Sequence, residues 1–165
     1  MSQHPFYSID CPDHLGSLLL TPCPGTKDIG LKQSLVELKN AGASAVLTLM
    51  LESEIYELGV TELKTLCEEL DMQWIHLPIV DEGAPEETFE LLWSQFKHEI
   101  HAILNDKESI AIHCKGGSGR TGIVAGKILL ERGANFDSTI EQIKALRPNA
   151  FSHDVQVEYM MQFKG

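Results

Sequence analysis

The sequence predicts one α/β domain over residues 1–165, with a central, mainly parallel sheet and helices on both of its faces. Short apolar runs alternate with longer amphipathic segments along the chain, which is the pattern of βαβ units. The length of 165 residues suits one domain, and no linker, internal repeat or low-complexity tract divides it. Open sheets of this class place their sites at the carboxyl ends of the strands.

Five short apolar runs bounded by turn residues predict the strands. They lie at residues 6–9, 17–20, 45–51, 74–79 and 109–112. The first two are separated by a proline, an aspartate and a glycine, and we expect both to be edge strands. The run at 45–51 is too short for an average helix and is almost entirely apolar, which predicts a buried parallel strand. We expect a polar connection at residues 52–60.

Six segments with apolar residues at helical spacing predict the helices. They lie at residues 31–40, 61–70, 85–104, 120–132, 137–146 and 152–163. Ser34 and Glu37 have the spacing of a capping box near the start of the first helix, and Asp137 is the expected cap of the fifth. Pro85 and the glutamates after it favour a first helical turn. Gly133 is the expected end of the fourth helix.

The strongest functional signal is the stretch His113-Cys114-Lys115-Gly116-Gly117-Ser118-Gly119-Arg120-Thr121-Gly122, which joins a buried strand to a buried helix. Three glycines within four positions let the backbone curl so that successive N–H groups face one concavity. The helix adds its unpaired N-terminal donors and the positive end of its dipole. We therefore expect the amides of residues 115–120 to bind a phosphate group against Cys114, whose thiol ionises readily in such a field.

Two further side chains of this stretch suit phosphoryl transfer. The planar guanidinium of Arg120 can bind two phosphate oxygens and follow the charge as the phosphoryl group becomes trigonal. The hydroxyl of Thr121 can donate to the thiolate and help it leave a phospho-cysteine. A nucleotide-binding Walker loop needs lysine where Arg120 stands. A structural glycine turn with an inert cysteine is the other alternative, and it does not require the spacing from Cys114 to Arg120.

An acid is needed opposite Cys114 to protonate the leaving oxygen. Asp81 is the first candidate, because it lies in a glycine-containing loop that follows a predicted strand of the sheet. The same carboxylate could then act as base on the hydrolytic water. Glu82, the next residue, is the rival candidate. A purely structural role for Asp81, in the loop or as a helix cap, is the third interpretation.

The signature of His113-Cys114, five residues and Arg120-Thr121-Gly122 resembles that of the cysteine-based protein phosphatases, and the compact dual-specificity group matches best. The resemblance extends from about residue 24 to 163 and implies a protein tyrosine phosphatase-like fold. It implies metal-independent hydrolysis of phosphate monoesters through a phospho-cysteine, with no cofactor. It supports Asp81 as the acid and places His113 in a hydrogen-bond network behind the thiolate. It also places Gln156 near the substrate pocket and the hydrolytic water.

The resemblance implies phosphotyrosine, phosphoserine or phosphothreonine proteins as substrates and suggests a protein kinase as partner. No long aromatic recognition loop lies at residues 21–60, which favours a shallow pocket. Lys115 matches the first loop residue of some phosphoinositide phosphatases, but Ser118 stands where they tend to carry a second lysine. Small phosphometabolites and RNA 5′ ends are the other substrates considered. A non-catalytic phospho-recognition module and a rhodanese-like sulfur carrier are the alternatives from other classes, although the complete set Cys114, Arg120 and Asp81 argues against both.

Charge and composition exclude several classes of function. The net charge of −11 argues against nonspecific nucleic-acid binding and against attraction to anionic membranes, so the positive potential must be local. The four cysteines, at positions 11, 23, 67 and 114, have the spacing of neither a disulfide framework nor a zinc site. His98 and His101 lack a third metal ligand at suitable spacing. With no secretory signal and no membrane-length apolar run in the sequence, we expect a cytoplasmic protein.

Overall fold

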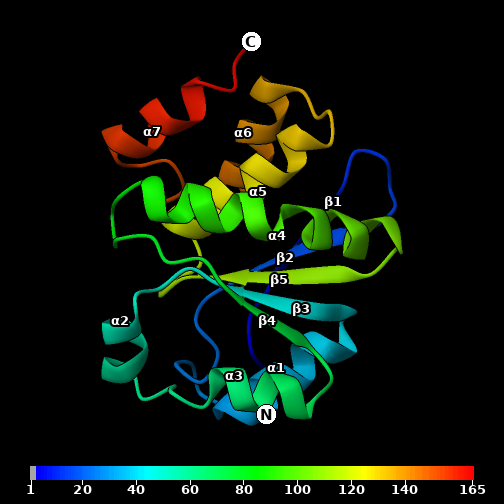
Figure 1. Cartoon of the computed structure of the whole chain (residues 1–165), viewed down its shortest axis with the longest axis vertical. Helices are drawn as coiled ribbons and strands as arrows, with labels where there is room; N and C mark the ends of the chain where they lie inside the picture. Colours follow the sequence, from blue (N-terminus) through cyan, green and yellow to red (C-terminus); the bar gives the residue numbers. More distant parts are fainter. Residues whose placement is uncertain (1–2) are drawn as a thin grey trace.

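A five-stranded sheet forms the centre of the structure, a computed structural model that describes residues 3–165 (Figure 1). The strands are β1 (Tyr7–Asp10), β2 (Ser17–Thr21), β3 (Ala43–Thr48), β4 (Gln73–His76) and β5 (Ser109–His113). Their order across the sheet is β1-β2-β5-β3-β4. All neighbours are parallel except β1 and β2, which are antiparallel. The predicted mainly parallel sheet is confirmed, but β2 lies between β1 and β5 and is not an edge strand.

Helices cover both faces of the sheet, as predicted. They are α1 (Leu31–Asn40), α2 (Glu52–Glu57), α3 (Leu63–Glu69), α4 (Glu87–Asn105), α5 (Gly119–Glu131), α6 (Phe136–Leu146) and α7 (Asp154–Met161). Figure 1 shows α1, α2 and α3 on one face and α4 to α7 on the other. Residues 52–60, expected to be a polar connection, contain α2, whose Ile55 packs into the core beside α1 and α3.

Two predicted helix caps were wrong. Helix α1 begins after Gly30, and Ser34 donates its hydroxyl proton to the Gly30 carbonyl oxygen at 2.8 Å instead of capping an N–H group. Helix α6 begins one residue earlier than expected because the side chain of Asn135, and not that of Asp137, accepts the backbone N–H of Ser138 at 3.0 Å. At α1 the nearby Gly30 carbonyl takes the Ser34 hydroxyl, and at α6 the preceding Asn135 takes the capping position.

The central strand β5 brings the functional loop to the middle of the carboxyl edge. Its apolar side chains are buried on both faces, with Ile110 and Ile112 in the core under α4 and α5 and Ala111 in the core under α1 and α3. Beyond β3 and β4 the chains stay extended and buried, and Ile79 donates its N–H to the Leu49 carbonyl oxygen at 2.9 Å. This contact carries the segment after β4 to the same edge as the segment after β5.

Among the helices of residues 3–165, none combines the length and the apolar character needed to cross a membrane. Within the same residues, no three histidine, cysteine or acidic side chains converge in a way that could hold a metal ion.

Candidate active site

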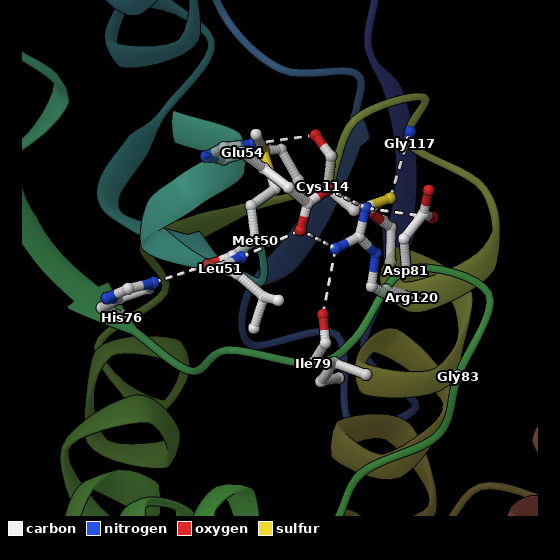
Figure 2. Close-up of polar contacts among 12 residues, drawn as sticks. Met50, Leu51, Glu54, His76, Ile79, Asp81, Gly83, Cys114, Gly117 and Arg120 are labelled. Carbon is white, nitrogen blue, oxygen red and sulfur yellow. Dashed lines mark hydrogen bonds and ion pairs between the residues drawn. The ribbon is translucent and has the colours of Figure 1, made fainter. Parts of the chain in front are cut away.

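The phosphate loop, defined here as residues 114–120, runs from the end of β5 into the first turn of α5. Cys114 lies at its start, and Figure 2 shows the backbone N–H of Gly117 directed at its sulfur. The backbone N–H of Gly117 lies 3.3 Å from Sγ, and the hydroxyl of Thr121 lies 3.2 Å from it. Both contacts use the sulfur as an acceptor, which is the role of a thiolate. The predicted pairing of Thr121 with the nucleophile is therefore present.

Arg120 lies beside the sulfur with only 1% of its surface exposed. Its Nη1 and Nη2 donate to the two carboxylate oxygens of Glu54 at 2.7 and 2.9 Å, and Nη1 also donates to the Ile79 carbonyl oxygen at 3.0 Å. Nη2 lies 3.2 Å from an Asp81 oxygen. Burial alone would lower the pKa of Arg120, but the hydrogen bonds to Glu54 and the negative charges of Cys114, Glu54 and Asp81 together outweigh burial and hold that pKa above its ordinary value. The guanidinium is thus a fixed cation.

Glu54 is a site residue that the sequence does not predict, because it lies in the segment expected to be a polar connection. It lies in the first turn of α2 and accepts the backbone N–H of Leu51 at 3.0 Å as well as the Arg120 fork. Burial would raise the pKa of the Glu54 carboxyl, but these hydrogen bonds lower it below its ordinary value. The available signal was a glutamate just after a buried strand that ends at the carboxyl edge.

The loop after β4 brings Asp81 over the phosphate loop, where its carboxylate contacts Arg120 (Figure 2). Glu82 follows with a left-handed φ of 62° and lines the same cavity. The side chain of Asp81 is 58% exposed, so it lies at the mouth of the site and not in its floor. The geometry places both carboxyls at the site, and Asp81 is the one paired with Arg120.

A cavity of about 220 Å³ joins the predicted site residues. Its walls include Asp81, Cys114, Gly116, Ser118, Gly119, Arg120 and Gln156. Two predicted phosphate-binding residues do not line it. Lys115 lines an adjoining cavity of about 240 Å³ with Glu57 and Val80, and Gly117 faces the sulfur through its backbone N–H. Three wall residues had not been predicted, namely Asn149, Ser152 and His153, which precede α7.

His113 is fully buried behind the loop, and burial lowers its pKa to about 4, so the ring is neutral. Its Nδ1 lies 3.1 Å from the Cys114 carbonyl oxygen, which can only accept, so Nδ1 carries the proton. Nε2 then accepts from the Thr48 hydroxyl at 2.7 Å, and Thr48 in turn accepts the indole N–H of Trp74 at 2.8 Å. This chain is the network that the resemblance implied, and its members Thr48 and Trp74 come from β3 and β4.

Gln156 is buried in α7 and connects the acid loop to the start of α5. Its amide nitrogen donates to the Gly83 carbonyl oxygen at 3.2 Å, and its side chain packs closely on Gly119. Its Oε1 is buried and has no hydrogen-bond partner among the described residues. Gln156 lines the cavity, near the place that the resemblance implies for it.

A protein-family model described as "Tc-R-P: Polymorphic toxin system, DSP-PTPase phosphatase" matches residues 25–134. Among curated proteins, cyclin-dependent kinase inhibitor 3 of Rattus norvegicus is 26% identical over 165 residues, covering 97% of this chain and 76% of the relative. The putative tyrosine phosphatase 197R of Invertebrate iridescent virus 6 is 33% identical over 84 residues, covering 49% of this chain and 29% of the relative.

Solved structures confirm the fold. The structure of kinase associated phosphatase, with its catalytic-site cysteine substituted by serine, has a TM-score of 0.86 at 22% identity and covers 99% of this chain and 96% of its own. Tk-PTP in its active form has a TM-score of 0.71 at 22% identity, with 89% and 90% covered. Since the family model spans most of the chain and includes the whole phosphate loop, the protein belongs to this DSP-PTPase family and is a cysteine-based phosphatase of the dual-specificity and tyrosine type.

Proposed function

We propose that the protein hydrolyses phosphate monoesters on side chains of a protein substrate, without a metal ion, through a phospho-cysteine on Cys114. The thiolate attacks phosphorus in line, and the loop amides and Arg120 hold the equatorial oxygens. Asp81 protonates the leaving oxygen and later takes a proton from the hydrolytic water. Gln156, which lines the cavity, is the residue proposed to orient that water. The observation that carries the proposal is the convergence of Cys114, Arg120 and Asp81 on one cavity.

The contacts of Arg120 suggest how the acid is released. Nη1 donates to Glu54 and Ile79, and Nη2 donates to Glu54 and contacts Asp81, while Nε has no protein partner among the described residues. An arriving phosphate dianion can take Nε–H and the outer Nη2–H as a bidentate pair. It would displace Asp81 from the guanidinium and leave that carboxyl free to face the leaving oxygen.

Several surface features favour a protein as substrate. The acid at the mouth is half exposed, which fits a shallow pocket able to take phosphoserine and phosphothreonine as well as phosphotyrosine. One apolar side chain is exposed near the mouth, that of Val80 in the acid loop, at 50%. The adjoining cavity with Lys115 offers room for residues next to the phosphorylated one.

A phosphorylated protein kinase is the partner we propose, because the relatives named cyclin-dependent kinase inhibitor 3 and kinase associated phosphatase carry kinases in their names. We propose the cytoplasm as its location. The four cysteines are free within the described part of the chain, as a reducing compartment requires.

Phosphate release from an aryl phosphate between about pH 5 and 8 tests the mechanism. Wild type should turn over in the presence of a chelator, Cys114→Ser should be inactive, and Asp81→Asn should lose the limb of the pH profile that requires a protonated acid. Glu82→Gln is the matched control and should keep that limb. If Glu82→Gln loses the limb and Asp81→Asn keeps it, the acid assignment is wrong.

Substrate class is tested with phosphopeptides, a phosphorylated kinase and phosphoinositides on the same enzyme preparation. Higher kcat/KM on phosphoproteins supports the proposal. Preference for phosphoinositides or small phosphometabolites contradicts it. Binding of phosphoproteins with no turnover by the reduced wild type would make the protein a recognition module.

A further inference from the structure

The first four carbonyl groups of the phosphate loop each accept a hydrogen bond from a donor outside the loop. The pairs are His113 Nδ1 to Cys114 O at 3.1 Å, Cys23 N to Lys115 O at 3.0 Å, Arg147 Nη2 to Gly116 O at 2.8 Å, and Arg147 Nε to Gly117 O at 3.1 Å. Two of the four bonds come from one side chain, that of Arg147.

These bonds fix the direction of the amides that bind the anion. The described residues contain no cis peptide bond, and in a trans peptide the C=O and N–H groups point in opposite directions. A carbonyl held outward therefore turns the N–H of the following residue inward. The peptide that joins Gly116 to Gly117 shows this directly, since its oxygen is held by Arg147 at 2.8 Å and its N–H points at Cys114 Sγ at 3.3 Å.

Arg147 is itself held in place from three sides. Its backbone N–H donates to the Ile143 carbonyl oxygen at 2.8 Å at the end of α6, and its own carbonyl oxygen accepts the N–H of Ala150 at 2.9 Å. Its guanidinium lies 4.6 Å above the ring centroid of Tyr7 in β1. Among residues 3–165 it forms no ion pair, and it does not line the catalytic cavity.

Because Arg147 contacts neither a carboxylate nor the cavity, an ion pair or a direct substrate contact does not explain its placement. The planar guanidinium of Arg147 places two N–H groups at the spacing of two consecutive carbonyl oxygens. A lysine ammonium is a point charge and cannot hold both oxygens in this fixed geometry. Gly117 adopts a φ of 79°, which glycine reaches without strain, so the backbone there has other accessible conformations. An unheld loop could rotate its peptides and turn carbonyl oxygens toward the anion.

We propose that Arg147 is a positioning residue for phosphate hydrolysis, which holds the Gly116 and Gly117 carbonyls outward so that the amides of Gly117 and Ser118 face the thiolate and the phosphoryl group. The proposal rests on the proposed function for its catalytic part. Its binding part concerns oxyanions alone and can be measured without turnover.

The test compares Arg147→Lys, Arg147→Gln and the control Lys144→Gln, which removes an exposed charge from α6. Tungstate affinity by calorimetry, kcat and KM on an aryl phosphate, and melting temperature are measured for each. A lost hydrogen bond from a charged donor corresponds to about a 10- to 100-fold loss, so both Arg147 variants should lose that much tungstate affinity and kcat/KM. Lys144→Gln should match the wild type.

Arg147→Lys decides between positioning and charge. If it retains wild-type tungstate affinity while Arg147→Gln loses it, the positive charge is sufficient and the proposal is wrong. If both match the wild type, it is also wrong. Should the Arg147 variants unfold, Tyr7→Leu removes only the ring under the guanidinium, and a loss of tungstate affinity in this folded variant supports the proposal while wild-type affinity overturns it. Weakened tungstate binding in variants of an enzyme that hydrolyses no phosphoprotein would refute the proposed function but not the role of Arg147.

Discussion

Replacing Glu54 by glutamine tests the least expected feature of the site. The Glu54 carboxylate accepts from both terminal nitrogens of Arg120, at 2.7 and 2.9 Å, and the guanidinium is 99% buried. Glutamine keeps one acceptor oxygen and loses the other together with the negative charge. The remaining carboxylate within reach of Arg120 is Asp81, at 3.2 Å. In Glu54→Gln, the Arg120 guanidinium should therefore lose one charged hydrogen-bond acceptor and bind Asp81 more tightly.

The size of the effect follows from one lost charge-assisted hydrogen bond. Such a bond contributes about 1.5–3 kcal/mol, and each 1.4 kcal/mol is a factor of ten, so kcat/KM should fall by about 10- to 100-fold. The melting temperature should also fall, because Arg120 remains a buried cation with less compensation. Steady-state kinetics on an aryl phosphate measures the first effect and calorimetry the second.

Glu52 in the same helix provides the matched control, because it is exposed, lines neither cavity of the site and forms no ion pair within the described residues. Glu52→Gln should keep wild-type kcat/KM and stability. If Glu54→Gln also keeps wild-type kcat/KM, Arg120 does not need its partner and this account of the site is wrong.

Three further perturbations have defined outcomes. Thr48→Val should lower kcat by about 3- to 10-fold, because it removes the hydroxyl that donates to His113 Nε2. Thr48→Ser keeps a hydroxyl and should restore kcat. Both are measured by steady-state kinetics, and equal kcat in Thr48→Val and wild type contradicts the hydrogen-bond chain. The free energy of unfolding should fall as pH drops from 6.5 toward 4, because burial lowers the pKa of folded His113 to about 4 and the unfolded chain takes up its proton first. Urea titrations across this range measure it, and an equally steep fall in His113→Asn would refute the assignment to His113. Gly117→Ala should lose about 1–3 kcal/mol of stability or more, since its φ is 79° and a Cβ there would lie 2.6 Å from Pro22 N. In the control Gly116→Ala the added Cβ meets no atom within 4 Å, so this variant should melt like the wild type. Equal melting temperatures for the two variants would contradict this reasoning.

The phosphate loop could be predicted from the sequence because its parts are contiguous. Cys114, Arg120 and Thr121 lie within eight positions, and strand, turn and helix signals surround them. Because strand, loop and helix follow one another directly, they also determine the direction of the loop, the two donors on the Cys114 sulfur and the burial of His113. The mainly parallel sheet followed from alternating strand and helix patterns for the same reason.

Residues that act from a distance could not be predicted in this way. Glu54 lies 66 positions before Arg120, and Arg147 lies more than 25 positions after the carbonyls it holds. A glutamate in a short polar segment and an arginine before a proline look like ordinary surface residues until the fold brings them to the loop. The position of β2 inside the sheet was missed because strand pairing between β2 and β5 spans most of the chain.

Trapping the phosphorylated enzyme tests the central claim most directly. Wild type mixed with an aryl phosphate, quenched in acid within milliseconds and digested, is expected to carry one phosphoryl group on the peptide that contains Cys114. The adduct should be absent from Cys114→Ser. Turnover by the wild type with no adduct, or with the phosphoryl group on another residue, would contradict nucleophilic catalysis by Cys114.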